Sequence, residues 1–258
     1  MKNAHGPEHG VLQFNFTLVS LLNICYNVVN YVTKGESKML TQTKKEFIEF
    51  MMSADVLRFG KFVTKSGRNT PYFVNTGNYK TGEQIAKLGG YYAKLVAETI
   101  GEDFTAMFGP AYKGIPLATS CAAALYNNHG ISKPYFFNRK EEKDHGEGGS
   151  LVGYKPVNGD KLIIIEDVIT AGTAVREVMP ILKGCGDVEV KHMFISVNRC
   201  EVGKVPGKTA IMEVQEEYGI EVHPIVTVLD IHEYLKENGT DPELLKDMEA
   251  YMAQYCVF

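Results

Sequence analysis

Two hydrophobic patterns alternate along most of the chain. Segments with helical spacing of apolar residues, or with many small residues, predict helices over 41–54, 81–100, 115–127, 174–182, 210–218 and 242–255. Short apolar runs bounded by turn residues predict strands at 72–74, 105–108, 134–138, 162–165, 188–197 and 222–228. This alternation predicts an α/β fold with a mostly parallel central sheet flanked by helices.

The apolar stretch 11–32 does not share this pattern. It is long enough to cross a bilayer, but five side-chain amides interrupt it, at Gln13, Asn15, Asn23, Asn27 and Asn30. Amides are costly in hydrocarbon. A signal peptide has a positively charged segment before its apolar stretch, but only one basic residue, Lys2, precedes this one. We therefore expect neither a membrane span nor a secretory signal.

Composition narrows the function classes. Hydrophobic residues make up 45% of the 258 positions and charged residues 22%, as in an ordinary globular protein. The net charge of −4 gives no basic field for nucleic acid, so any anion site must be a local cluster. Five cysteines without a CxxC pair predict neither a zinc site nor a disulfide framework, and they favour reduced thiols in a cytoplasmic protein.

The segment 162–175, LIIIEDVITAGTAV, carries the strongest chemical signal. A strand runs into Glu166 and Asp167, a loop with Thr170 and Gly172 follows, and then a helix begins. Loop N–H groups and a helix N-terminus favour phosphate, whereas two carboxylates suit the hydroxyls of a sugar. The string is neither a Walker A loop nor GxGxxG. An ordinary strand-to-helix turn explains the acid pair alone, but the whole string favours a ribose-phosphate site.

The same segment resembles the phosphoribosyl pyrophosphate (PRPP) motif of type I phosphoribosyltransferases. Four further strings narrow the resemblance to the orotate phosphoribosyltransferase family: TKSGRNTPYF at 64–73, FGPAYKGIPLA at 108–118, FNRKEEKDHGEGG at 137–149 and ISVNR at 195–199. The resemblance covers 39–258. It implies the type I phosphoribosyltransferase fold as a single domain, with a small hood (39–80 plus part of the C-terminal region) and a flexible glycine-rich flap. Residues 1–38 are expected to be an extension outside that fold.

The resemblance also implies the reaction, in which orotate and PRPP give orotidine 5′-monophosphate and pyrophosphate. It assigns PRPP contacts to Lys65, Tyr112, Lys113, Arg139, Lys140, Lys143, His145, Glu166, Asp167, Val168, Ile169, Thr170, Ala171, Gly172, Thr173 and Ala174. Asp167, Lys143 and His145 are the expected catalytic residues, with Asp167 transferring a proton or stabilising the cation. Without the resemblance, Lys113 and the flap residues would pass as solvated surface groups. Glu166 departs from the Asp that this family usually has, and the longer acid should still reach a hydroxyl.

Orotate contacts are expected from Lys65, Phe73, Val74, Thr170 and Arg199. The guanidinium of Arg199 can bind the orotate carboxylate with two hydrogen bonds. Val74 replaces a common aromatic residue, so its backbone rather than a stacked ring should meet the base. Arg68, in the same KSGR string as Lys65, is expected to be structural.

The resemblance also implies a cofactor and a partner. Mg²⁺ would be held mainly through PRPP, with Asp167 as a ligand through water, because Mg²⁺ favours phosphate, water and few carboxylates. A homodimer is expected, in which the flap carries Lys143 into the neighbouring site.

Two other functions stay open at this point. A transferase for another base would not need Arg199, and a nucleotide-sensing regulator that binds nucleic acid would need a basic arm or a helix-turn-helix, which the sequence lacks. We expect no fusion with orotidylate decarboxylase, since no DxKxxD string occurs in the sequence.

Overall fold

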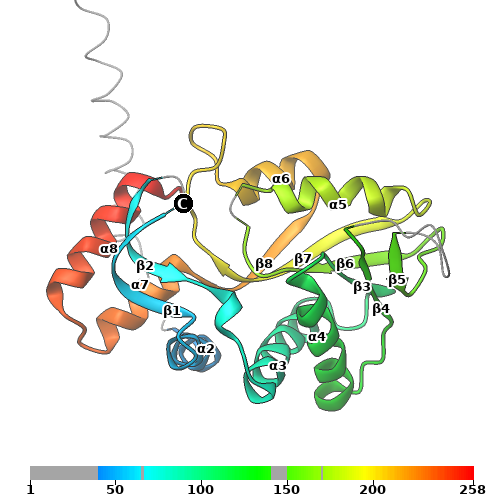
Figure 1. Cartoon of the computed structure of the whole chain (residues 1–258), viewed down its shortest axis with the longest axis horizontal. Helices are drawn as coiled ribbons and strands as arrows, with labels where there is room; N and C mark the ends of the chain where they lie inside the picture. Colours follow the sequence, from blue (N-terminus) through cyan, green and yellow to red (C-terminus); the bar gives the residue numbers. More distant parts are fainter. Residues whose placement is uncertain (1–39, 65–66, 141–149, 170) are drawn as a thin grey trace, which may run out of the picture. The chain divides into compact units, whose positions relative to one another are not determined.

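The computed structural model describes residues 40–64, 67–140, 150–169 and 171–258 (Figure 1). Residues 40–257 form one compact unit. The apolar stretch 11–32 and the rest of the expected extension lie outside the described residues. Within the described part of the chain, no helix is both long enough and apolar enough to span a bilayer.

A six-stranded sheet forms the centre of the molecule, in the spatial order β5-β4-β3-β6-β7-β8. Its strands are β3 (Ala106–Gly109), β4 (Tyr135–Asn138), β5 (Leu151–Gly153), β6 (Lys161–Ile165), β7 (Glu189–Asn198) and β8 (Glu221–Thr227). All neighbours pair in parallel except β4 and β5, which are antiparallel. The predicted α/β fold with a mostly parallel sheet is therefore confirmed.

Helices cover both faces of this sheet. Figure 1 shows α3 (Gly82–Thr99) and α4 (Gly114–His129) on one face, and α5 (Thr173–Lys183) and α6 (Ala210–Tyr218) on the other. The core under α5 and α6 is mostly aliphatic, with Ile164, Ile195, Leu182 and Val214 all fully buried. Each such side chain contributes about 1.5–3 kcal/mol through burial, so the sheet is a rigid base for the loops at its edge.

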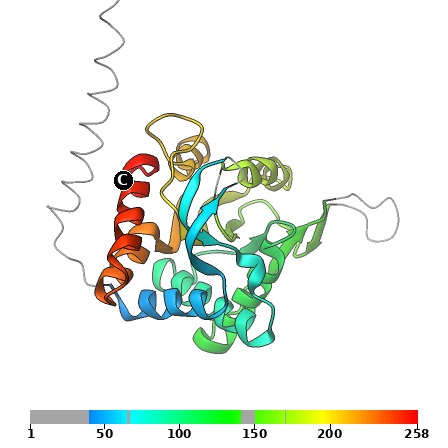
Figure 2. The ribbon, with the colours of Figure 1, turned by 60° about the vertical axis from the view of Figure 1, so that its left-hand side comes forward.

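A second, two-stranded sheet pairs β1 (Leu57–Val63) with β2 (Asn69–Val74) in antiparallel fashion. It lies beside α2 (Gln42–Ser53), α7 (Val228–Glu237) and α8 (Pro242–Tyr255) (Figure 2). Tyr72 of β2 is fully buried and meets the Tyr251 ring of α8 edge-on, with ring centroids 5.8 Å apart. The small sheet is therefore held by the C-terminal helix, although the two are far apart in sequence.

Threonine caps explain where several helices begin. The side chains of Thr41, Thr81 and Thr227 each accept a hydrogen bond from the backbone N–H three residues on, which satisfies a donor that the helix itself leaves free. Thr227 and Asp230 form a capping box that starts α7. The strand predicted at 222–228 therefore ends one residue early, and α7 was missed because its first residues continue the apolar run of β8.

Candidate active site

Glu166 and Asp167 lie directly after β6, in the middle of the sheet's carboxyl edge. Open α/β sheets bind ligands at this edge. Both side chains are buried, and each residue is only 7% exposed. Burying two adjacent acids is costly unless each is neutralised or hydrogen-bonded. The pKa of Asp167 is lowered and that of Glu166 is raised, so the two acids differ in how this cost is offset.

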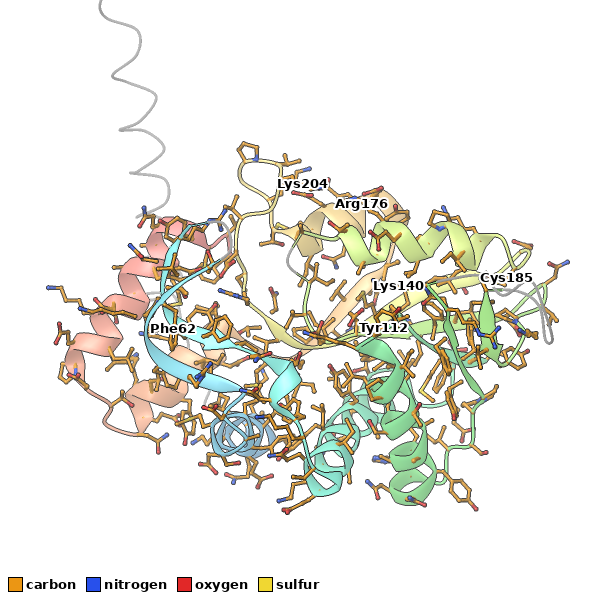
Figure 3. All side chains as sticks on the ribbon, in the orientation of Figure 1. Phe62, Tyr112, Lys140, Arg176, Cys185 and Lys204 are labelled. Atoms are coloured by element: carbon orange, nitrogen blue, oxygen red, sulfur yellow. The ribbon has the colours of Figure 1, made fainter. Side chains whose placement is uncertain are left out.

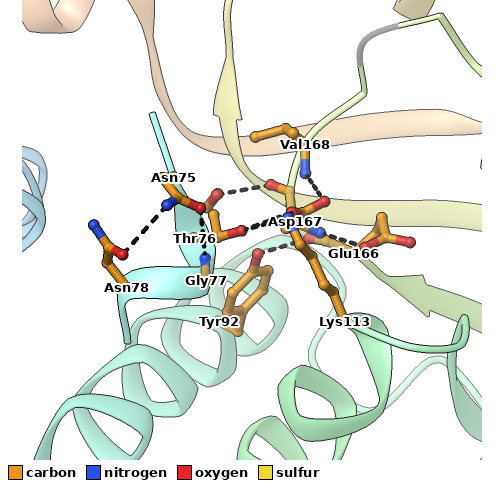
Figure 4. A network of polar contacts seen from close by, with 10 residues as sticks. Asn75, Thr76, Gly77, Asn78, Tyr92, Lys113, Glu166, Asp167 and Val168 are labelled. Carbon is orange, nitrogen blue, oxygen red and sulfur yellow. Dashed lines mark hydrogen bonds and ion pairs between the residues drawn. The ribbon is translucent and has the colours of Figure 1, made fainter. Parts of the chain in front are cut away.

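Asp167 is ionised and paired (Figure 4). Its Oδ2 accepts hydrogen bonds from Lys113 Nζ at 2.8 Å and from Thr76 Oγ1 at 2.7 Å, and its Oδ1 accepts one from the Val168 N–H at 2.7 Å. Burial alone would raise the pKa of Asp167, but the bonds from Lys113 and Thr76 outweigh it, and the pKa lies below its ordinary value. The network joins three segments at one carboxylate.

Glu166 is mostly protonated at neutral pH. Burial, followed by the negative charge of Asp167, raises the pKa of Glu166 to about 8. Its Oε1 accepts a hydrogen bond from the Asp167 N–H at 2.8 Å, and its backbone carbonyl accepts one from the Tyr92 hydroxyl at 2.6 Å. The acid pair thus holds one negative charge, with a proton on the other carboxyl.

The loop after the acids is shaped by Gly172 and Arg176. Gly172 precedes α5 with φ +68°, and a Cβ there would come within 2.9 Å of Arg176 Nη1. Arg176 Nη1 donates to the Ala171 carbonyl at 2.8 Å, while the same guanidinium pairs with Glu213 at 3.2 Å and Glu217 at 2.7 Å on α6. This anchor fixes the turn that presents the α5 N-terminus. No motif pointed to Arg176, because its role depends on α6.

The loop between β3 and α4 carries Lys113 and Tyr112. The Ala111 N–H donates to Asn138 Oδ1 at 2.9 Å, which ties this loop to the end of β4. Lys140 Nζ lies 5.2 Å from the Tyr112 ring centroid, and Figure 3 shows the two side chains close together. The structure therefore brings three predicted PRPP residues, Tyr112, Lys113 and Lys140, to the edge occupied by Asp167. Asn138 was not predicted from sequence.

Three of the expected orotate residues, Phe73, Val74 and Arg199, lie in or beside β2. Phe73 and Val74 end this strand, and Thr76, two residues later, contacts Asp167. Arg199, just beyond β7, packs its guanidinium carbon 5.1 Å from the Tyr72 ring centroid of β2. Its Nη2 lies 2.6 Å from Glu201 Oε1, and its Nε is buried without a hydrogen-bond partner among the described residues.

Some predicted residues cannot be placed in this geometry. Lys65, Lys143, His145 and Thr170 lie outside the described residues. Arg139 is described, and its N–H donates to the Ser150 carbonyl at 2.7 Å. Arg68 lies 3.9 Å from Glu201 and over the Tyr255 ring, in agreement with a structural role.

Residues 75–228, which include the acid pair and the loop that leads into α5, match the family model described as "Phosphoribosyl transferase domain". A protein from Clostridium acetobutylicum, named orotate phosphoribosyltransferase, is 52% identical over 208 residues, which are 81% of this chain and 92% of the relative. Another of that name, from Thioalkalivibrio sulfidiphilus, is 50% identical over 83% of this chain and 98% of the relative. The crystal structure of orotate phosphoribosyltransferase from Francisella tularensis superposes with a TM-score of 0.74 at 36% identity, covering 82% of this chain and 99% of that one.

The chain therefore belongs to the orotate phosphoribosyltransferase family. It is an enzyme of the phosphoribosyltransferase class, as the sequence motifs predicted.

Proposed function

We propose that the chain transfers the 5-phosphoribosyl group from PRPP to orotate in pyrimidine biosynthesis. In this reaction a bond forms between N1 of orotate and C1 of the ribose, the C1–oxygen bond breaks, and pyrophosphate leaves with its electron pair. The proton of N1 passes to solvent or to a base. The observation that carries this proposal is the contact of Asp167 with Lys113 and Thr76 at the sheet edge.

PRPP binding would rearrange this contact. The side chain of Lys113 is 59% exposed and reaches Asp167 from the solvent side. A pyrophosphate group offers a denser negative charge than one carboxylate, so Lys113 would turn to it on binding. Asp167 would then be free to accept a hydrogen bond from a ribose hydroxyl. In this way Lys113 keeps Asp167 ionised until the substrate replaces it.

The loop 168–174 would hold the 5-phosphate. Its described backbone N–H groups lead into the N-terminus of α5, where the helix dipole favours an anion. Since Asp167 is ionised and nearby, its charge would stabilise the positive character that develops at C1 as pyrophosphate departs. Glu166, protonated at neutral pH, would donate to a hydroxyl rather than add a second repelling charge.

We also propose that Mg²⁺ assists this chemistry. The described residues offer one ionised carboxylate, Asp167, among hydroxyl and ammonium groups, which fits an ion brought by PRPP and contacted through water. Mg²⁺ supplies neutralisation of the leaving pyrophosphate. The protein's own side chains would orient the substrates and place the ammonium of Lys113.

Arg199 would recognise the orotate carboxylate. It lies against Tyr72, which directly precedes Phe73 and Val74 in β2, and this proximity supports a shared orotate site for Arg199, Phe73 and Val74. Its present partner is Glu201, at 2.6 Å. The substrate carboxylate would compete with Glu201 for this guanidinium, and Lys65 and Thr170 would complete the pocket.

Three further proposals follow from the family resemblance. The chain would act as a homodimer whose 137–149 segment brings Lys143 and His145 to the neighbouring site. It would work in the cytoplasm, a reducing compartment, which agrees with the free thiols of Cys121, Cys185, Cys200 and Cys256. Residues 1–38 would be an extension outside the catalytic domain of 39–258.

Substrate choice tests the proposed function. Purified protein, Mg²⁺ and PRPP should consume orotate, followed by its absorbance, and should leave uracil and adenine unchanged. Turnover of uracil or adenine without turnover of orotate would overturn the assignment.

A further inference from the structure

His192 of β7 and Glu221 and His223 of β8 form a cluster that the proposed reaction does not use. The two strands are neighbours, and β8 is the edge strand of the sheet (Figure 1). His192 pairs in register with Glu221 near the beginning of β8. The substrate residues follow the other ends of the strands. At ~3.3 Å per residue, the six residues from His192 to Asn198 put the cluster about 20 Å from the carboxyl edge of β7.

Strand geometry places the three side chains on one face. Residues two apart in a strand point the same way, so Glu221 and His223 share a face of β8. The Phe194 ring, two residues after His192, stacks on the His223 ring with centroids 5.0 Å apart and an interplanar angle of 27°. This stacking holds the His223 ring beside His192.

The donor atoms face one another. His192 Nδ1 lies 3.1 Å from His223 Nε2, and Glu221 Oε2 lies 3.6 Å from the first nitrogen and 3.8 Å from the second. Donors about 2.0–2.1 Å from a tetrahedral Zn²⁺ stand about 3.3–3.4 Å from each other. Only small rotations separate the observed triangle from that size. The Glu221 side chain is 59% exposed, so its carboxylate can make the larger adjustment.

We propose that His192, Glu221 and His223 bind one Zn²⁺ ion, with water completing the coordination. Two imidazoles and one carboxylate suit Zn²⁺ and are a poor set for Mg²⁺, which favours oxygen ligands. The site is separate from the proposed Mg²⁺ at the carboxyl edge. The bound ion would link the edge strand β8 to β7 and stabilise the sheet there.

The direction of the pKa shift of His223 agrees with this site. Burial, and then the neighbouring His192, lowers the pKa of His223. Metal binding requires neutral imidazole, so His223 is ready to bind at neutral pH. A direct hydrogen bond between the two rings accounts for the 3.1 Å contact without a metal, and the experiment must separate these two cases.

Calorimetric titration of the chelator-treated, full-length protein with Zn²⁺ separates them. We expect saturable binding at one ion per chain, and at least roughly ten-fold weaker binding in His192→Gln and Glu221→Gln, since each removes a ligand. Co²⁺ should give the visible absorption of a protein-bound ion in the wild type and lose it in both variants. His129→Gln, at the exposed end of α4, is the matched control and should bind like the wild type.

Thermal unfolding gives a second measurement. Zn²⁺ at about 100 times its wild-type Kd should raise the wild-type Tm by about 5 °C or more, and it should raise the Tm of Glu221→Gln clearly less, because that variant binds the ion more weakly. Because Glu221 is largely exposed, this variant should fold even if His192→Gln does not. Absence of saturable binding to the wild type, or equal binding by the wild type and Glu221→Gln, would overturn the proposal.

Discussion

Lys113 Nζ lies 2.8 Å from Asp167 Oδ2, although the two residues are 54 positions apart in the chain. Lys113 follows β3 and Asp167 follows β6, and these strands pair in parallel. Parallel pairing brings their carboxyl ends to one edge. The ion pair is therefore a direct consequence of the sheet order, and it keeps the proposed catalytic carboxylate of Asp167 ionised before substrate binds.

Removing the ammonium should impair catalysis more than folding. We expect Lys113→Ala to lower kcat by about 10²–10³-fold, which is typical when one group that stabilises transition-state charge is lost. Steady-state kinetics with orotate and PRPP measure this loss. Lys94→Ala on α3 is the control, since Lys94 is partly exposed and pairs with Glu98, four residues further along the same helix. A change of less than about three-fold in kcat/KM for Lys113→Ala would contradict the assigned role.

Glu166 should make stability fall as pH rises. Its folded pKa of about 8 lies above the unfolded value near 4.5, so the native state binds the extra proton between these pH values. By linkage, the free energy of unfolding decreases as pH rises through that window. Between pH 4.5 and pH 9 this linkage should lower the free energy of unfolding of the wild type by an amount on the order of 4 kcal/mol. Glu166→Gln keeps a neutral side chain at every pH, so it should not show this decrease.

Urea unfolding of the wild type and Glu166→Gln at pH 5, 7 and 9 measures this difference. Glu177→Gln, an exposed position on α5, is the matched control and should follow the wild-type profile. Parallel profiles for the wild type and Glu166→Gln would show that Glu166 is ionised in the folded protein at neutral pH.

Alanine variants of Gly172 and Gly159 separate two effects, the backbone strain of a positive φ and a change in the shape of the loop before α5. Both have positive φ, +68° and +87°, but a Cβ at Gly172 would meet Arg176 and Val214, while one at Gly159 meets nothing within 4 Å. Both alanine variants should lose about 1 kcal/mol of stability. Only Gly172→Ala should also raise the KM for PRPP, because only its Cβ would displace the loop. We expect a rise of about ten-fold, which corresponds to a loss of about 1.4 kcal/mol of binding free energy. An equal KM in the two variants would mean that the loop does not hold PRPP.

Arg199 is expected to act on orotate and not on PRPP. Arg199→Ala should raise the KM for orotate by about ten- to 100-fold, since a charged hydrogen-bond partner contributes about 1.5–3 kcal/mol, and should change the KM for PRPP little. Arg68→Ala is the comparison, because Arg68 also approaches Glu201 but stacks on Tyr255. Unchanged orotate affinity in Arg199→Ala would place the carboxylate elsewhere.

Local sequence signals predicted most of the fold. The helices predicted at 210–218 and 242–255 agree with α6 and α8 at both ends. Their starts were predictable because a capping residue precedes each helix, Thr209 for α6 and Asp241 for α8. Strands β1 and β5 were not predicted. Strand β5 has three residues and depends on pairing with β4 rather than on its own sequence.

The site was predictable where its residues are contiguous. Glu166, Asp167 and the loop after them were identified from one string, and Lys113 from another. Four residues of the site were missed because each acts through a partner that is distant in the sequence or that no motif marks. Thr76 contacts Asp167, and Tyr92 contacts the Glu166 carbonyl. Asn138 contacts the Ala111 N–H, and Arg176 contacts the Ala171 carbonyl and Glu213. Such contacts depend on tertiary structure and leave no local pattern.

Pyrophosphate release with orotate as acceptor tests the central claim most directly. With Mg²⁺ and PRPP, the wild type should release one pyrophosphate for each orotate consumed, and Asp167→Asn, which keeps the shape but loses the charge, should be slower by about 10²-fold or more. A wild type that consumes no orotate, or an Asp167→Asn variant as fast as the wild type, would contradict the account.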